Sequence, residues 1–384
     1  MQRAFMFERL LRAEMRIAFR TDASLQIGTG HVMRCLTLAD SLRERGAQCS
    51  FVCRPHAGHL LEMIARHGHQ VLAMTALQKG VSSNQSITVH ADWLGIDWGT
   101  DAIETSQVLN NSLGSEPFDW LVVDHYALER RWEQEQRPYA RRIMVIDDLA
   151  DRPHDCDLLL DQNLGRTAQD YSGLLPQNTS TLIGPQYALL RSEFAEHRIQ
   201  SLARRAQRPQ LKHILITMGG IDKSNATGQL LDALKVCILP TDLRITVVIG
   251  PHAPWLEQVK AQAEHMPWPT QVLVGVSNMA QLMSDSDLAI GAAGGTAWEC
   301  CCLGLPSLVL ALERNQFAGA ISLNNVGAAI TLKANLPISD MLTPSLLTQL
   351  TPANLAQLSH AAAMVADGKG SDRTADRMVE IIHA

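Results

Sequence analysis

The sequence contains no uninterrupted apolar stretch of the roughly 18 residues that a membrane-spanning helix requires, although hydrophobic residues make up 46% of its 384 residues. It also has no excess of basic residues. The 33 lysines and arginines against 39 acidic residues leave a net charge of −6, which weighs against nucleic acid as a partner. We therefore expect a soluble globular protein without a membrane or nucleic-acid partner. The sequence leaves its oligomeric state open.

Paired cysteine motifs and a secretory leader are absent as well. Without a CxxC pair, neither a disulfide framework nor a zinc site is indicated, and the eight cysteines are typical of buried apolar residues in a reducing compartment. The segment 1–14, MQRAFMFERLLRAE, lacks an apolar core and a cleavage site. We interpret it as an upstream start-codon extension rather than as a short amphipathic helix, and we expect a cytoplasmic protein.

Several catalytic signatures are also missing. The sequence has no nucleophile elbow of the Ser-His-Asp type, no HExxH and no Walker loop. An acidic cluster of the kind that holds magnesium is not apparent either. These absences predict an enzyme without a metal or another cofactor.

Short β-rich runs alternate with helical patterns throughout the chain. RIAFR, CSFVC, DWLVVD, RIMVID and DLLLD predict a doubly wound domain over 15–190, and HILIT, LRITVVIG, QVLVGV, DLAIG and PSLVLAL predict another over 211–360. The polar, basic stretch 195–210 between them suits a linker, and 361–384 is expected to be helical. The fold class is therefore α/β, with two Rossmann-like domains facing a ligand cleft at the carboxyl ends of both sheets.

The first strand leads into a glycine-rich turn, IGTGHVMR, that opens a helix. Gly28 and Gly30 would let the backbone approach an anion at the helix N-terminus. His31 at the helix start and Arg34 one turn later place an imidazole and a guanidinium near that tip. Because a helix N-terminus favours the neutral imidazole, His31 is a candidate general base, although a lone histidine there can also be a cap or a core residue.

The second domain has two similar turns. Gly219 and Gly220 precede a helix capped near Asn225, and GAAGGTAWE places Gly295 before a helix with Glu299 one turn in. Glu299 suits the hydroxyls of a ribose better than it suits a phosphate. Two anion-tolerant turns in one domain indicate a nucleoside diphosphate, although a tight turn alone also explains a glycine pair.

Polar residues follow three strands of the first domain. Asp124, His125 and Tyr126 follow DWLVVD, Asp147 and Asp148 follow RIMVI, and Asp161, Gln162 and Asn163 follow LLL. Strand ends of an open sheet face the ligand, but aspartates there also cap the next helix. For Asp147 and Asp148 the two interpretations carry equal weight.

The motifs, taken in order, resemble one known family. IGTGHVMRCLTLA, VVDHYAL, IDDLADRPHDCDLLLDQN, YALLRSEF, ITMGGID and GAAGGTAWECCCLGLPSLVL…NQ, between residues 15 and 316, resemble the UDP-2,4-diacetamido-2,4,6-trideoxy-β-L-altropyranose hydrolases of pseudaminic acid biosynthesis, a pathway of flagellin glycosylation. That family is similar in fold to the GT-B N-acetylglucosaminyltransferase of peptidoglycan synthesis.

The resemblance implies hydrolysis of the UDP-amino sugar to UDP and the free 2,4-diacetamido-2,4,6-trideoxy-L-altrose, with inversion at C1 and His31 as the base. It implies sugar contacts from Asp22, Gly28, Gly30, Arg34, Tyr126, Asn315 and Gln316, and UDP contacts from Met218, Gly219, Gly295, Thr296 and Glu299. Two other functions stay open: a GT-B glycosyltransferase with a UDP-amino sugar donor, and a nucleotide-sugar-binding protein without turnover.

Overall fold

The computed structural model describes residues 15–77, 89–114, 116–332, 337–343, 346–347 and 349–383. The extension 1–14, interpreted above from its composition, lies outside the described residues. The chain divides into two compact units, each interrupted in sequence. The first unit comprises Met1–Leu160, Gln169–Leu182 and Thr374–Ala384, and the second comprises Asp161–Ala168 and Ile183–Arg373.

The described part of the first unit is built on a seven-stranded sheet in the order β3-β2-β1-β4-β5-β6-β7. The neighbouring pairs from β3 through β6 are all parallel. Its central strands carry nearly continuous apolar residues, as strands covered on both faces require. The strands are β1 (Arg16–Thr21), β2 (Gln48–Cys53), β3 (Gln70–Ala73), β4 (Phe118–Asp124), β5 (Ala140–Ile146), β6 (Leu158–Asp161) and β7 (Ser180–Ile183).

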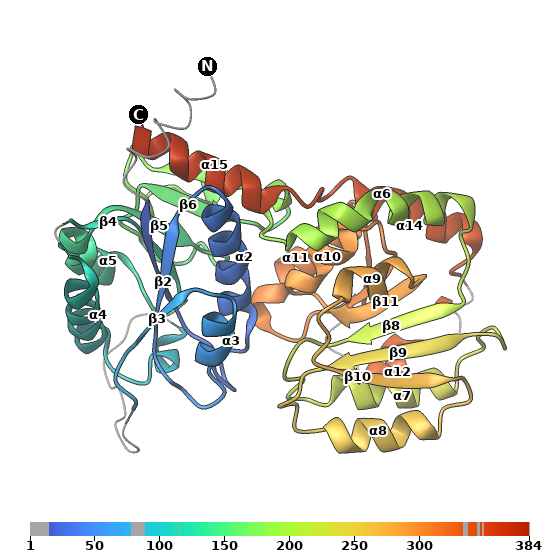
Figure 1. The fold of residues 1–384 in the computed structure, drawn as a ribbon. Helices are drawn as coiled ribbons and strands as arrows, with labels where there is room; N and C mark the ends of the chain where they lie inside the picture. The colour runs from blue at the N-terminus through green and yellow to red at the C-terminus, as the bar shows by residue number, and fades with distance from the viewer. Residues whose placement is uncertain are drawn as a thin grey trace, which may run out of the picture. The chain divides into compact units, whose positions relative to one another are not determined.

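Helices cover both faces of this sheet, with α2 and α3 on one side and α4 and α5 on the other (Figure 1). The C-terminal helix α15 contributes to the same unit through a hydrogen bond from Trp120 Nε1 to the carbonyl oxygen of Met378. The helices are α2 (Gly30–Glu44), α3 (Leu61–Arg66), α4 (Trp98–Ser112), α5 (Arg130–Gln136) and α15 (Gly370–His383), with short 3-10 turns at Ala91–Trp93, Arg137–Tyr139 and Ala168–Tyr171.

The second unit has a six-stranded parallel sheet in the order β10-β9-β8-β11-β12-β13. Alternate residues of β8 enter two different cores: Ile214 and Ile216 pack with α7 and α8, whereas Leu215 packs with α6, α9 and α10. Its strands are β8 (His213–Thr217), β9 (Arg244–Ile249), β10 (Thr270–Val274), β11 (Leu288–Ala292), β12 (Ser307–Leu310) and β13 (Ile330–Leu332). Its helices are α6 (Ser192–Gln207), α7 (Ala226–Lys235), α8 (Leu256–Glu264), α9 (Met279–Ser284), α10 (Gly295–Cys302), α11 (Phe317–Asn325), α12 (Ile338–Met341) and α14 (Pro352–Ala363), with 3-10 turns at Pro185–Tyr187 and Arg314–Gln316.

Each sheet reverses its strand order at its middle, between β1 and β4 in the first unit and between β8 and β11 in the second. Ligands of open α/β sheets bind at such reversal points, outside the carboxyl ends of the strands. The first reversal point lies beside the IGTGH turn, and the second lies beside the two glycine turns assigned to UDP. The predicted class of two Rossmann-like α/β domains is confirmed.

The expectation of a linker over 195–210 is wrong. Residues 192–207 form helix α6, and its basic side chains bind carbonyl groups of the second unit. The guanidinium of Arg205, which is 5% exposed, donates to the carbonyl oxygens of Met283 and Ser286 at 2.8 Å. Composition suggested a solvated segment because arginine is usually exposed, whereas here it satisfies buried carbonyl groups. The division of the chain also falls at Ile183 rather than after residue 190.

Candidate active site

The first reversal point brings together His31 and Asp124, which lie 93 positions apart in the chain. Thr21 at the end of β1 pairs in register with Asp124 at the end of β4. The turn after β1 leads to Gly30, the first residue of α2, so that His31 stands in its first turn. The structure thereby places an imidazole beside a carboxylate that sequence analysis had only noted at a strand end.

His31 and Asp124 form a close pair. The Nδ1 atom of His31 lies 2.6 Å from Asp124 Oδ1, and the aspartate is fully buried. Burial alone would raise the pKa of Asp124, but Arg34 and His31 outweigh it and hold the pKa well below its usual value. The carboxylate is therefore ionised and accepts a hydrogen bond from Nδ1–H, which leaves the lone pair on Nε2. This nitrogen has no hydrogen-bond partner in the described part of the chain and is not among its buried unpaired atoms.

Arg34, one turn into α2 as expected, pairs with two carboxylates. Its Nε and one terminal nitrogen each donate to Asp124 at 2.6 Å, and its other terminal nitrogen donates to Asp148 Oδ2 at 2.5 Å. Burial lowers the pKa of Arg34, but both carboxylates raise it more, so the guanidinium stays charged. Tyr126 Oη also donates to Asp148 Oδ2, at 2.7 Å. Arg34 thus holds the partner of His31 in place, rather than standing ready for an anion.

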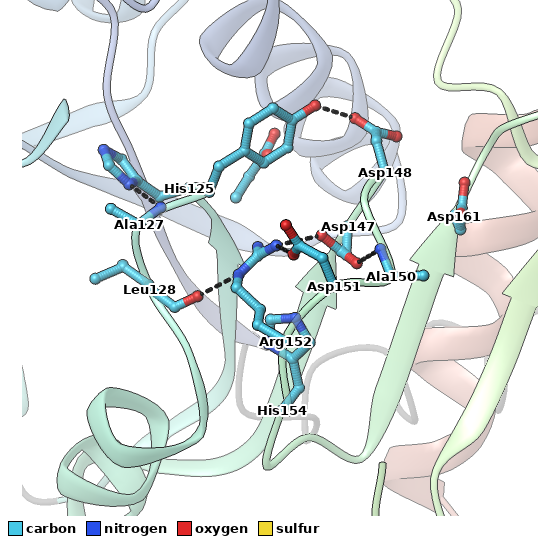
Figure 2. Close-up of polar contacts among 12 residues, drawn as sticks. His125, Ala127, Leu128, Asp147, Asp148, Ala150, Asp151, Arg152, His154 and Asp161 are labelled. Carbon is cyan, nitrogen blue, oxygen red and sulfur yellow. Dashed lines mark hydrogen bonds and ion pairs between the residues drawn. The ribbon is translucent and has the colours of Figure 1, made fainter. Parts of the chain in front are cut away.

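The loop after β5 explains why two neighbouring aspartates differ in role. Asp147 is fully buried and accepts hydrogen bonds from the amide of Ala150 and from Arg152, both at 2.8 Å, while Arg152 donates to the carbonyl oxygen of Leu128 (Figure 2). Burial alone would raise the pKa of Asp147, but the charge of Arg152 outweighs burial and lowers this pKa to about 2. Ala150 has a φ of 51°, a strained conformation for a non-glycine residue. Asp147 anchors the loop, and Asp148 is the residue that the loop presents to the site.

Aromatic rings surround His31. The ring of Tyr126 lies 4.5 Å from the imidazole and that of Trp93 lies 6.0 Å away, both nearly perpendicular to it. Trp93 and Tyr126 stack on each other at 5.5 Å, and His90 packs against both. Trp93 and His90 were not predictable from the sequence, because the segment that carries them has neither strand nor helix periodicity.

The side chain of Asp22, a predicted sugar contact, is fully buried. One oxygen accepts from the amide of Arg54 at 2.7 Å, and the other lies 2.8 Å from the guanidinium of Arg20. The Nε2 atoms of His56 and His125 face the same oxygen at 3.6 and 3.5 Å. In this structure Asp22 fixes the end of β1, so its charge serves the fold.

The glycines of both units leave room beside their helices. A Cβ atom added to Gly30 or Gly295 would meet nothing within 4 Å, and neither residue has a positive φ. Nothing in the packing of the described residues therefore requires glycine at these two helix starts. Gly28 and Gly219 are also open but have φ values near +85°, which glycine adopts without strain. The side chain of Met218 belongs to the core, so that only its backbone is open to a ligand.

Four further predicted residues lie in α10 or in the 3-10 turn Arg314–Gln316. Gly294 caps α10 without a side chain, and Thr296 stands in its first turn. Glu299 follows, and burial raises its pKa to about 7, while Arg191 at 3.9 Å opposes the rise. The side chain of Gln316 accepts from the amide of Leu312 at 2.9 Å, and its Nε2 lies near Gly294. Asn315 is exposed in the same 3-10 turn.

Two features are absent from the described residues. No group of three or more histidine, cysteine, aspartate or glutamate side chains in this part of the chain is arranged to hold a metal ion. Likewise, none of its helices has the length and apolar character needed to cross a membrane.

This fold is the GT-B architecture of glycosyltransferases. Residues 214–376 match the model of the glycosyltransferase family 28 C-terminal domain. The structure is similar to that of MurG from Acinetobacter baumannii, with a TM-score of 0.68, 17% identity, and coverage of 96% of this chain and 100% of that one. The calicheamicin glycosyltransferase is also similar, with a TM-score of 0.59, 14% identity, and coverage of 97% and 98%.

Among curated proteins, the chain is similar to the UDP-2,4-diacetamido-2,4,6-trideoxy-β-L-altropyranose hydrolase of Campylobacter jejuni. The two are 27% identical over 320 residues, which cover 83% of this chain and the whole of the relative. An uncharacterized protein of Methanocaldococcus jannaschii is 25% identical over 77% of this chain, and the match spans only 55% of that protein. The resemblance expected from the motifs is confirmed.

Proposed function

We propose that this protein hydrolyses UDP-2,4-diacetamido-2,4,6-trideoxy-β-L-altropyranose to UDP and the free amino sugar, with inversion at C1. The observation that carries the proposal is the His31–Asp124 pair at 2.6 Å, which directs the basic lone pair to Nε2. The similarity to the Campylobacter jejuni hydrolase supports this substrate and a place in pseudaminic acid biosynthesis.

In the proposed reaction, Nε2 of His31 accepts a proton from a water molecule as the water oxygen bonds to C1. The bond from C1 to the β-phosphate oxygen breaks, and its electron pair leaves with UDP. Asp124 stabilises the imidazolium that forms, because its carboxylate already accepts the Nδ1 proton. Arg34 and Asp148 keep Asp124 in place throughout, so the base requires little rearrangement.

The second unit would hold the leaving group. Open space at Gly219 and Gly295 lets a diphosphate approach backbone amides, and α10 directs the positive end of its dipole toward that space. Glu299 would accept hydrogen bonds from the ribose hydroxyls in its ionised form. Thr296 follows Gly295 in the first turn of α10, and Gln316 Nε2 would lie 3.8 Å from a Cβ atom at Gly294.

A glycosyltransferase is the second candidate, since the GT-B structures above are glycosyltransferases. The same Nε2 atom would then deprotonate an acceptor hydroxyl instead of water. A binding protein without turnover is less favoured, because binding alone does not need a histidine whose Nε2 lone pair is set by a carboxylate on Nδ1.

The test is release of UDP from the proposed substrate without any acceptor. We expect release by the wild type and a loss of about 10²- to 10⁴-fold in His31→Asn, with UDP binding retained. His69→Asn is a matched control. His69 is also buried and lies away from the site, and its Nε2 atom is 3.0 Å from Asp40 Oδ1. Tight binding of the UDP-sugar without release would refute the hydrolase and favour the transferase.

A further inference from the structure

The rings of Trp93, Tyr126 and His90 form a continuous surface beside the base, which we call the aromatic wall. Trp93 belongs to the 3-10 turn Ala91–Trp93, and the next residue, Leu94, is only 2% exposed and anchors that turn. Tyr126 comes from the other side, in the loop after β4. The wall is therefore built by two separate segments that meet at His31.

Polar groups next to the wall are already used within the chain. The hydroxyl group of Tyr126 donates its hydrogen bond to Asp148, and the three guanidinium nitrogens of Arg34 donate to Asp124 and Asp148. Burial raises the pKa of the Tyr126 phenol well above its usual value, and Asp148 raises it further, so the ring remains neutral. A sugar hydroxyl on this side would lose its water without gaining these groups as partners.

Trp93 offers a different combination. Its ring faces are apolar, and its indole N–H has no hydrogen-bond partner among the described residues. An acetamido group matches both properties, since its methyl group can contact a ring while its carbonyl oxygen accepts a hydrogen bond. A hydroxyl in its place would match only the N–H.

The position of the wall relates it to one carbon of the sugar. A water held by Nε2 lies about 3 Å from that nitrogen and about 3 Å from C1 at the moment of attack. C1 is then within about 6 Å of Nε2, and the wall begins 4.5 to 6.0 Å from the centre of the same imidazole. Substituents on C2, which is bonded to C1, are the ring substituents closest to the reacting carbon, and the wall lies at a comparable distance from the imidazole.

We propose that the aromatic wall, through Trp93, is the subsite for the 2-acetamido group of the substrate. This inference rests on the proposed function, because it assumes a sugar that reacts at His31. The wall makes the enzyme select sugars by the acetamido methyl and carbonyl together. An enzyme without Trp93 loses this selection and keeps its affinity for UDP.

The test measures binding without turnover. Dissociation constants are determined by calorimetry in the His31→Asn background for UDP, for the UDP-2,4-diacetamido sugar, and for its analogue with a hydroxyl at C2. We expect His31→Asn to prefer the acetamido sugar by about 10- to 100-fold. Adding Trp93→Ala should reduce the preference to less than about threefold, and Trp93→Phe should retain part of it, because the ring remains without its N–H.

Trp98→Ala is the matched control, since Trp98 lies five residues further along and its ring packs under Arg131 instead of against His31. It should leave the preference unchanged, and an unchanged urea-unfolding transition in every variant shows that the fold is intact. An undiminished preference in Trp93→Ala would overturn the proposal. UDP release by the wild type is measured separately: if release fails while Trp93 still controls the preference, the hydrolase is refuted and the subsite stands.

Discussion

Replacing Asp124 by asparagine tests whether the pair with His31 drives turnover. The carboxylate accepts three hydrogen bonds at 2.6 Å, one from His31 and two from Arg34. An amide has only one oxygen, so either orientation sets an NH2 group against a donor of Arg34. If the NH2 group lies on the His31 side, it donates to Nδ1. The proton of the neutral ring then lies on Nε2, the nitrogen whose lone pair must accept a proton from water.

Two quantities should change. Turnover should fall by about 10²- to 10⁴-fold, since Nε2 loses its lone pair or the imidazolium loses its counter-charge. The free energy of unfolding should fall by about 3 to 5 kcal/mol, because Arg34 keeps only Asp148 as an ionised partner. Steady-state UDP release gives the first quantity, and urea unfolding followed by circular dichroism gives the second.

Asp101→Asn separates stability from chemistry. Asp101 is also fully buried, and it accepts from Arg20 at 2.8 Å, Arg54 at 2.9 Å and Trp132 at 3.0 Å, without contacting His31. The free energy of unfolding of Asp101→Asn should fall by a similar amount. Its turnover should stay at the wild-type level at urea concentrations below its unfolding transition. The reasoning fails if the folded Asp124→Asn protein turns over within about fivefold of Asp101→Asn, since that would leave the His31 partner without a chemical role.

Three further predictions follow from single features. Gly295→Ala should fold normally but weaken UDP binding at least about tenfold in calorimetry, whereas Gly319→Ala, which has equal space around it, should not. The UDP affinity of the wild type should fall as the pH drops below 7 and Glu299 protonates, and Glu299→Gln should remove this component of the pH profile. Burial lowers the pKa of His125 to about 3, although Asp22 opposes this shift. The unfolded chain therefore binds a proton at His125 near pH 6.5, whereas the folded chain binds it only near pH 3. Stability should therefore decrease as the pH falls from 6.5 toward 3, by about 2 kcal/mol at pH 5, and His125→Gln should reduce that decrease in denaturant titrations.

The sequence predicted the parts of the site that are local in the chain. Gly30, His31 and Arg34 lie within one helical turn, so their proximity follows from the helix geometry alone. The partner of His31 was not predictable in the same way. Asp124 reaches it only because β4 pairs beside β1, and a strand-end position did not distinguish a functional carboxylate from a helix cap.

Charge was misassigned where buried partners compete for it. Arg34 near a helix N-terminus suggested an anion site, but its guanidinium forms ion pairs with two carboxylates that follow strands distant in the sequence. The arginines of α6 suggested a linker for the same reason, since the carbonyl groups that they satisfy are invisible in the sequence. Trp93 lies in a segment without periodicity, so that only its contact with His31 identified it.

The two sets of functional residues belong to different units, and this separation has a kinetic consequence. His31, Arg34, Asp124 and Asp148 all lie in the first unit, and so do the hydrogen bonds that link them to one another. The residues assigned to UDP lie in the second unit. Because the base is oriented by its own unit, UDP is not needed to assemble it. Changes at the UDP turns should therefore act mainly on KM, and changes in the Asp124 network mainly on kcat, which holds for water and for an acceptor hydroxyl alike.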